Sequence, residues 1–187
     1  MIRYKVGNLL ESDMQTLVNT VNCVGVMGKG IALAFKNRYP AMYRDYELRC
    51  RRAEVKPGVP YRYPDLPGAN QLSLDIDAHP LVSESNPVIL VFPTKDHWRS
   101  KSKREYVVRG LERLRDNHDR WDIQSIAFPA LGCGNGGLDW LEIGPLMRDY
   151  LTELDIPVEI YVPPGIDPET PFTNRADLLV AHSSCTG

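Results

Sequence analysis

The feature that most constrains the fold is a glycine-rich loop, residues 22–30, between a β-branched apolar run and a helical pattern. The run at residues 16–21 predicts a buried strand, and the spacing of apolar residues within 31–38 predicts a helix. This first glycine loop holds three glycines, whereas one tight turn needs one. Glycines let the backbone approach a ligand closely, and a helix N-terminus attracts anions. The loop therefore predicts a site for a phosphorylated ligand, with a purely geometric turn as the alternative.

A second glycine loop, residues 131–137, also follows an apolar strand pattern and precedes a helical one. It contains the GxGxxG spacing of dinucleotide-binding folds, but only 50 residues follow it, too few for the further strand–helix units. Gly28-Lys29-Gly30 does not fit a P-loop either, because the spacing differs and no hydroxyl residue follows the lysine. Two such loops can instead enclose a diphosphate from both sides with backbone N–H groups and no metal.

Strand and helix patterns alternate along most of the chain. Continuous apolar runs at residues 87–93 and 123–129 predict strands buried on both faces. Further strands are expected at residues 2–6, 72–76 and 157–162 and near Tyr61, a turn-like segment at 79–86, and helices at 40–52, 104–118 and 142–154. This alternation predicts a mostly parallel or mixed sheet covered on both faces. Ligands of such sheets bind at the carboxyl ends of the strands, where the two glycine loops and an exposed polar loop at residues 94–103 (the lysine loop) are expected.

The composition indicates a single globular domain. Of 187 residues, 43% are hydrophobic and 25% are charged, which is ordinary for such a domain. No apolar run is long enough to span a membrane, and the N-terminus lacks the apolar region of a signal peptide. The four cysteines form no CxxC pair, so we expect free thiols in a cytoplasmic protein. We also expect no metal and no cofactor, because the sequence has no cluster with metal-ligand spacing.

Three segments resemble, in order, the binding loops of macrodomains, the ADP-ribose-binding fold: Gly7-Asn8-Leu9, residues 19–32 and residues 130–140. The resemblance covers about residues 1–162 and leaves residues 163–187 as a C-terminal tail, packed or partly loose. It implies an α/β fold of three layers, α/β/α, around a mixed, mostly parallel six-stranded sheet. Within macrodomains, residues 92–99 are similar to the branch with the human terminal ADP-ribose glycohydrolase, and most of all to bacterial DarG antitoxins. DarG enzymes remove ADP-ribose from thymidine in DNA and so reverse the toxin DarT.

The resemblance implies, residue by residue, where ADP-ribose binds. Asn8 matches the position that reads the adenine amino group, with a simple turn asparagine as the alternative. Asn19 and Asn22 border the distal ribose, where Asn22 orients the anomeric carbon. The remaining substrate-binding residues that it implies are Leu9, Gly28, Gly30, Ile31, Ala32, Thr94, Leu131, Gly132, Cys133, Gly134, Asn135 and Gly136. Cys133 is interpreted as part of the wall, with a reactive thiol as the alternative.

Lys95 is the candidate nucleophile, because a lysine at this position of the resembling branch attacks the anomeric carbon of the distal ribose. That reaction requires a neutral amine. Burial or nearby positive charge must therefore lower a pKa that is ordinarily about 10.4. Arg99, Lys101 and Lys103 are candidates for that charge. The alternative is a surface lysine that contacts a phosphate.

One position departs from the branch. The human glycohydrolase has an aspartate two residues after its GCG motif, where this chain has Gly136. The acid that protonates the leaving group is then unassigned, and the alternatives are Asp96, His97, water and the leaving base itself. A thymine ring nitrogen is a better leaving group than an alkoxide, so the departure is compatible with a base-linked substrate.

The segment from Lys95 to Arg104 carries five basic residues and one acidic residue. With Trp98 it is a candidate contact for single-stranded DNA, because aromatic rings stack on bases and cations pair with phosphates. A tryptophan that caps the core and a merely solvated charged surface are the alternatives. The resulting hypothesis is a monomeric hydrolase of ADP-ribosylated single-stranded DNA with a DarT-like toxin as a partner. A hydrolase of protein-linked or O-acyl ADP-ribose and a non-catalytic ADP-ribose reader are the rival hypotheses.

Overall fold

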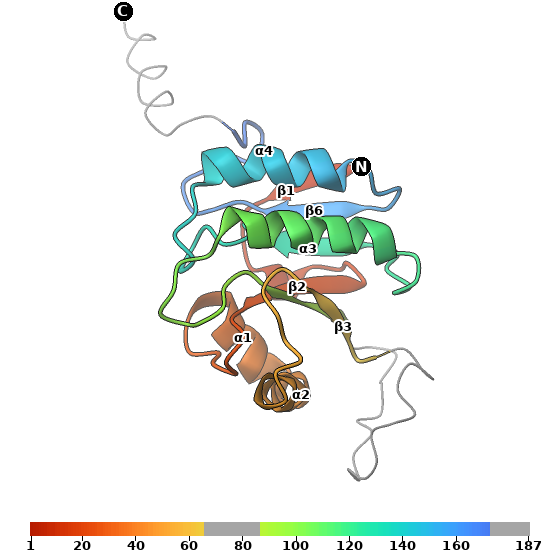
Figure 1. Cartoon of the computed structure of the whole chain (residues 1–187). Coiled ribbons are helices and arrows are strands. Elements are labelled where there is room, and N and C mark those ends of the chain that lie inside the picture. The colour runs from red at the N-terminus through yellow and green to blue at the C-terminus, as the bar shows by residue number, and fades with distance from the viewer. Residues whose placement is uncertain (66–86, 173–187) are drawn as a thin grey trace, which may run out of the picture.

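The computed structural model describes residues 1–65 and 87–172 and places a six-stranded sheet at the centre (Figure 1). In spatial order the strands are β1 (Ile2–Lys5), β6 (Val158–Tyr161), β5 (Ile126–Pro129), β2 (Thr16–Val21), β4 (Val88–Pro93) and β3 (Tyr61–Tyr63). Neighbouring strands run parallel, except that β3 pairs antiparallel with β4. The mixed, mostly parallel sheet implied by the family resemblance is therefore confirmed.

Helices cover both faces of this sheet (Figure 1). The helices α1 (Gly30–Arg38) and α2 (Pro40–Arg51) pack on one face, and α3 (Arg104–Asn117) and α4 (Trp140–Leu151) pack on the other. In β4, Leu90 and Phe92 belong to the core beneath α3 and α4, whereas Val91 belongs to the core beneath α1 and α2. A strand that is apolar on both sides requires cover on both, which explains the three layers. No helix in the described ranges has the length and apolar character needed to cross a membrane.

The parallel arrangement brings five strand ends to one edge of the sheet, which we call the carboxyl edge. The first glycine loop, the lysine loop and the second glycine loop all leave from it. Ser102 joins two of these loops, because its N–H donates to the Gly136 carbonyl at 2.9 Å and its hydroxyl donates to Thr94 Oγ1 at 3.1 Å. Ser102 and Thr94 are buried, so the lysine loop is less exposed than its polar composition predicts.

Several element boundaries differ from the prediction. Strand β5 starts at Ile126 and not at Ile123 as predicted. Ile123 is buried, but its N–H donates to the His118 carbonyl at 3.0 Å and not to a neighbouring strand. Helix α4 starts two residues early, because the Asp139 side chain accepts the Leu141 N–H at 2.9 Å and caps the first turn. The expected loop after β1 contains a short 3₁₀ helix, η1 (Leu9–Glu11). The predicted strand at 72–76 and the turn-like segment at 79–86 lie outside the described residues.

Residues 163–172, the first part of the expected tail, pack against the domain. Phe172 meets Tyr4 edge-on with ring centroids 5.6 Å apart, and it stacks on Trp140 at 6.3 Å. The indole N–H of Trp140 donates to the Pro171 carbonyl at 2.6 Å. These contacts hold the segment against the start of α4, next to the carboxyl edge.

Candidate functional site

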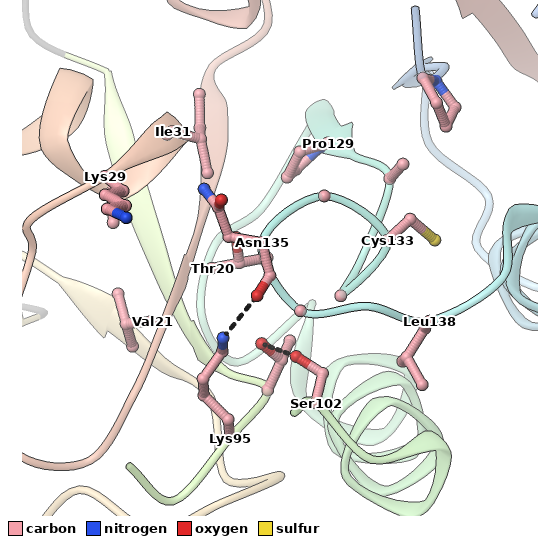
Figure 2. Close-up of a pocket in the computed structure, with 18 of the residues that line it drawn as sticks. Thr20, Val21, Lys29, Ile31, Lys95, Ser102, Pro129, Cys133, Asn135 and Leu138 are labelled. Carbon is pink, nitrogen blue, oxygen red and sulfur yellow. Dashed lines mark hydrogen bonds between the residues drawn. The ribbon is translucent and has the colours of Figure 1, made fainter. Parts of the chain in front are cut away.

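A cavity of about 960 Å³ opens along the carboxyl edge (Figure 2). This volume is near the upper end of the range for small-molecule sites, roughly 300–1,000 Å³. Residues at the ends of all five parallel strands line it. The predicted site residues on its wall are Asn8, Leu9, Asn22, Gly28, Gly30, Ile31, Ala32, Thr94, Lys95, Gly132, Cys133, Gly134, Asn135 and Gly136. The fold therefore brings segments that are far apart in the sequence into one site.

Two predicted residues do not line the cavity. Asn19 lies within β2, fully buried, and its side-chain amide donates to the Met27 sulfur at 3.8 Å. Leu131 is fully buried in the core beneath α3 and α4. The loop position expected for Asn19 is corrected, whereas Leu131, expected in the wall through its backbone, stays a prediction. Asn19 belongs to the strand and not to the loop after it, and the Leu131 side chain turns away from the cavity into the core.

The cavity wall suits an anion. Its charged side chains are three cations, Lys29, Lys95 and Arg99, and one carboxylate, Asp139. Helix α1 begins at this wall with no side-chain cap and no acidic residue in its first turn. Its first N–H groups are therefore available to a ligand phosphate. The α4 N-terminus is less suited to this, because Asp139 already caps it.

The second glycine loop forms the opposite wall. Within the described part of the chain, no protein acceptor takes the backbone N–H of Gly134, Asn135 or Gly136. Consecutive free N–H groups of this kind bind anions. Cys133 lies in the same wall, and burial raises the pKa of its thiol to about 12. A thiol that stays protonated at neutral pH is a poor nucleophile, which supports the interpretation of Cys133 as wall.

Gly136 has no room for a side chain. A Cβ atom built there would collide with the Gly132 carbonyl oxygen and with the Ser102 hydroxyl. Because the Gly136 carbonyl also accepts the Ser102 N–H, this part of the loop is held in place. The loop as it is folded here therefore cannot present an aspartate at this position.

Asn22 organises the first glycine loop. Its side-chain oxygen accepts the N–H of Val24 at 3.0 Å and the hydroxyl of Tyr46 at 3.1 Å. Its side-chain amide donates to the Val26 carbonyl at 2.5 Å. An amide group has two hydrogens, so one donor is left for a ligand at the cavity wall. The first role of this residue is thus to shape the loop, which the sequence alone does not reveal.

Lys95 projects into the cavity from the end of β4 (Figure 2). Its Nζ donates to the backbone carbonyl of Asn135, 3.0 Å away on the opposite wall. Burial lowers the pKa of this lysine from its ordinary value of 10.5. The predicted contribution from Arg99, Lys101 and Lys103 is not found, since desolvation alone accounts for the shift.

The carboxylates near Lys95 are poorly placed to protonate a leaving group. Asp96 does not line the cavity and accepts the His97 N–H at 2.7 Å. The hydrogen bond from Ser100 and that from the His97 backbone lower the pKa of Asp96, so it stays ionised. The His97 ring also lies off the wall, and its Nδ1 accepts the Arg99 N–H at 3.2 Å.

Within the described residues, no group of three or more His, Cys, Asp or Glu side chains is arranged to hold a metal.

The end of the cavity next to β1 and β6 contains residues that the sequence reasoning missed. Asn8 caps η1 by accepting the Leu10 N–H at 3.1 Å, so it serves the turn and also lines the cavity. Tyr161 and residues 162–164 line the cavity beside it. Their place at the end of the last predicted strand could have indicated this role, because the carboxyl ends of parallel strands meet at the same edge of the sheet. The sequence interpretation assigned them to a strand and a tail instead.

Comparison with known proteins identifies the family. A family model described as "Macro domain" matches residues 18–61 and 77–147. A DNA ADP-ribosyl glycohydrolase of Mycobacterium tuberculosis is 44% identical over 166 residues, 88% of this chain and 43% of that protein. A DNA ADP-ribosyl transferase–DNA ADP-ribosyl glycohydrolase fusion protein of Thermosipho africanus is 42% identical over 162 residues, 84% of this chain and 40% of that protein. This chain thus spans about two fifths of the length of these curated relatives.

Solved structures agree with this family. The macrodomain of Mycobacterium tuberculosis DarG has a TM-score of 0.74 and 44% identity, over 87% of this chain and 98% of that one. The Thermosipho africanus DarTG structure in complex with ADP-ribose has a TM-score of 0.76 and 38% identity, over 95% of this chain and 46% of that one. The resemblance to DarG macrodomains is confirmed. With its three-layer fold and its cavity between two glycine loops, this chain belongs to the macrodomain family.

Proposed function

We propose that this chain is a DNA ADP-ribosyl glycohydrolase that removes ADP-ribose from thymidine and so reverses the action of a DarT-like toxin. The observation that carries this proposal is Lys95, a lysine of lowered pKa inside a cavity that suits an anion. The names of the similar relatives support the same activity. On this reading the protein acts as a monomer in the bacterial cytoplasm, where its DNA substrate is.

The cavity accommodates ADP-ribose along the carboxyl edge. Adenine lies beside Asn8 and Tyr161, and the diphosphate lies between the start of α1 and the second glycine loop. This places the distal ribose near Asn22, whose remaining amide hydrogen can donate to a ribose hydroxyl. The anomeric carbon then faces Lys95.

In the proposed reaction the neutral amine of Lys95 attacks the anomeric carbon. A nitrogen–carbon bond forms to the lysine while the glycosidic bond to the thymine ring nitrogen breaks. The leaving base carries away the electron pair of that bond and takes up a proton from solvent. The lysine–ribose adduct, through the ring-opened sugar as a Schiff base, is then hydrolysed by water. That step releases ADP-ribose and restores the lysine.

The absence of a well-placed carboxylic acid is compatible with a base-linked substrate, as it is with the acyl-linked substrates of the rival hypothesis. Asp139 is the one carboxylate among the described residues that line the cavity, and it is engaged with the backbone of α4. The delocalised anion of a thymine ring can leave without being protonated by the protein. An alkoxide that leaves from an O-glycosidic bond needs such protonation more. The Gly136 position therefore agrees with a substrate whose leaving group needs little help.

Lys95→Ala tests the proposal. We expect release of ADP-ribose from an ADP-ribosylated single-stranded oligonucleotide to fall at least a hundredfold, because the nucleophile is lost. Affinity for free ADP-ribose, measured by calorimetry, should change much less. Lys56→Ala, which removes an equal charge from an exposed side chain off the cavity wall, is the matched control.

Three results decide against the proposal. Unchanged turnover in the Lys95 variant removes the lysine from the mechanism. Release of ADP-ribose from a modified glutamate peptide and not from the oligonucleotide identifies a hydrolase of protein-linked ADP-ribose. Binding of ADP-ribose with no turnover of either substrate identifies a reader. Trapping of an adduct at Lys95 with borohydride tests the Schiff base separately.

A further inference from the structure

Exposed apolar side chains gather around the Lys95 end of the cavity. Val24 is 45% exposed, Val26 is 38% exposed and Trp98 is 47% exposed. Val26 and Trp98 both line the cavity, from the first glycine loop and the lysine loop. The two loops are joined directly, because the Cys23 N–H donates to the Asp96 carbonyl at 3.1 Å. The mouth of the site beside the nucleophile therefore has an apolar rim.

Trp98 does not cap the core. It is absent from both core clusters of the described residues, whereas Trp121 and Trp140 pack in the core beneath α3 and α4. Exposing a large aromatic ring to water forgoes the free energy that burial would provide. A tryptophan held at the mouth of a ligand cavity is better explained by a partner that covers it.

Arg99 adds an available positive charge to the ring. Its guanidinium carbon lies 4.5 Å from the centroid of the Trp98 ring, and the side chain forms no ion pair within the described residues. Two of the neighbouring cations lie near carboxylates instead. Arg104 pairs with Glu142 at 2.9 Å, and Lys103 lies 3.9 Å from Glu105. Of the residues from Lys95 to Arg104, Lys95 and Arg99 are the cations that line the cavity, and Arg99 is the one that lies over the Trp98 ring.

We propose that Trp98 and Arg99 bind the nucleotide next to the modified thymidine in a single strand, with its base stacked on Trp98 and its phosphate paired with Arg99. An aromatic ring beside a cation is the arrangement that binds single-stranded nucleic acid without sequence preference. The proposal rests on the proposed function, because it assumes that the strand enters at the Lys95 end. It adds that the enzyme recognises the strand as well as ADP-ribose.

Two substrates separate strand recognition from catalysis: a single-stranded oligonucleotide with one ADP-ribosylated thymidine, and the ADP-ribosylated nucleoside prepared from it. For Trp98→Ala we expect kcat/KM on the oligonucleotide to fall roughly tenfold to a hundredfold more than on the nucleoside, through KM. Trp98→Phe should recover most of the difference. Arg99→Ala should make the dependence of log kcat/KM on log salt shallower by about 0.7. Arg120→Ala, an exposed arginine off the cavity wall, should leave both unchanged.

Binding measured in the Lys95→Ala background distinguishes failure of this inference from failure of the proposed function. There we expect the modified oligonucleotide to bind more tightly than free ADP-ribose, and Trp98→Ala to remove that advantage. Equal affinity for the two ligands, or equal losses on both substrates in the Trp98 variant, overturns the inference. If the oligonucleotide binds with the Trp98-dependent advantage but wild-type protein does not cleave it, strand recognition stands and the hydrolase assignment fails.

Discussion

At the scale of single residues, Gly136 shows how a missing side chain can determine chemistry. The Gly132 carbonyl and the Ser102 hydroxyl fill the space that a Cβ would need. The backbone of Gly136 is then free to face the cavity, and no carboxylate can act there. Under the proposed function, a preference for a good leaving group would follow from this loop packing.

Gly136→Ala should destabilise the protein by about 1–3 kcal/mol. The new methyl group would have to displace the Gly132 backbone carbonyl as well as the Ser102 side chain. ADP-ribose affinity should fall with it, since the loop supplies the N–H donors. Gly134→Ala is the matched control within the same loop, because a Cβ there meets no atom within 4 Å. Its stability should stay within about 0.5 kcal/mol of wild type. Urea unfolding and calorimetry measure both quantities, and equal stabilities for the two variants would contradict the packing argument.

The lowered pKa of Lys95 predicts a pH dependence. In the proposed mechanism only the neutral amine reacts, so kcat/KM should rise with pH and level off below the ordinary lysine pKa of 10.5. The ammonium form favours a diphosphate ligand, so affinity for ADP-ribose should change in the opposite direction over the same pH range. Stopped assays and calorimetry at matched pH values test both trends. A rate that falls as the pH rises, or one that titrates at the ordinary lysine pKa of 10.5, would contradict this account.

At the scale of elements, Glu159 ties the last strand to the first part of the chain. It is 3% exposed on β6, and its carboxylate accepts hydrogen bonds from Arg3 at 3.1 Å, Lys5 at 3.3 Å and Ser12 at 2.7 Å. Burial alone would raise its pKa, but the hydrogen bonds from Ser12 and Lys5 outweigh burial and lower it. This carboxylate therefore holds β1 and Ser12, the residue after η1, against β6.

Glu159→Gln should lower the free energy of unfolding at pH 7 by about 1–3 kcal/mol, because hydrogen bonds to a charged group are lost. A carboxylate with a lowered folded-state pKa stabilises the fold above its unfolded pKa of about 4.5. The difference between variant and wild type should therefore shrink as the pH falls below that value. Glu153→Gln is the control, since that exposed residue pairs with Arg115 at 3.4 Å and should change stability by under about 1 kcal/mol. A difference that does not depend on pH would refute the electrostatic account.

Elements with local signals were predictable from sequence. The apolar run of β2 and the proline at the start of α2 determine their boundaries through nearby residues, and both appear as predicted. The face on which a side chain lies is set by distant contacts, which is why Asn19 was placed at the cavity although it packs beneath the first glycine loop. Ser102 and Tyr161 were missed for the same reason. Their roles depend on the Gly136 carbonyl and on the strand order, and neither can be read from adjacent residues.

At the scale of the whole molecule, the sheet order explains why one cavity collects residues from most of the chain. The first and last strands, β1 and β6, are neighbours, and β5 and β4 flank β2. Each strand end contributes one section of the wall, from Asn8 and Tyr161 beside β1 and β6 to Lys95 after β4. The order of sections along the cavity wall therefore follows the order of strands in the sheet and not the order of residues in the chain.

The contact across the cavity between Lys95 and the Asn135 carbonyl has a kinetic consequence. Asn135 also lies against α1, with its side-chain nitrogen 2.6 Å from the position that a Cβ on Gly30 would occupy. Together these contacts bridge the lysine loop, the second glycine loop and the start of α1 across the cavity. Under the proposed function, this bridge would have to open before a diphosphate bound beneath it could leave sideways.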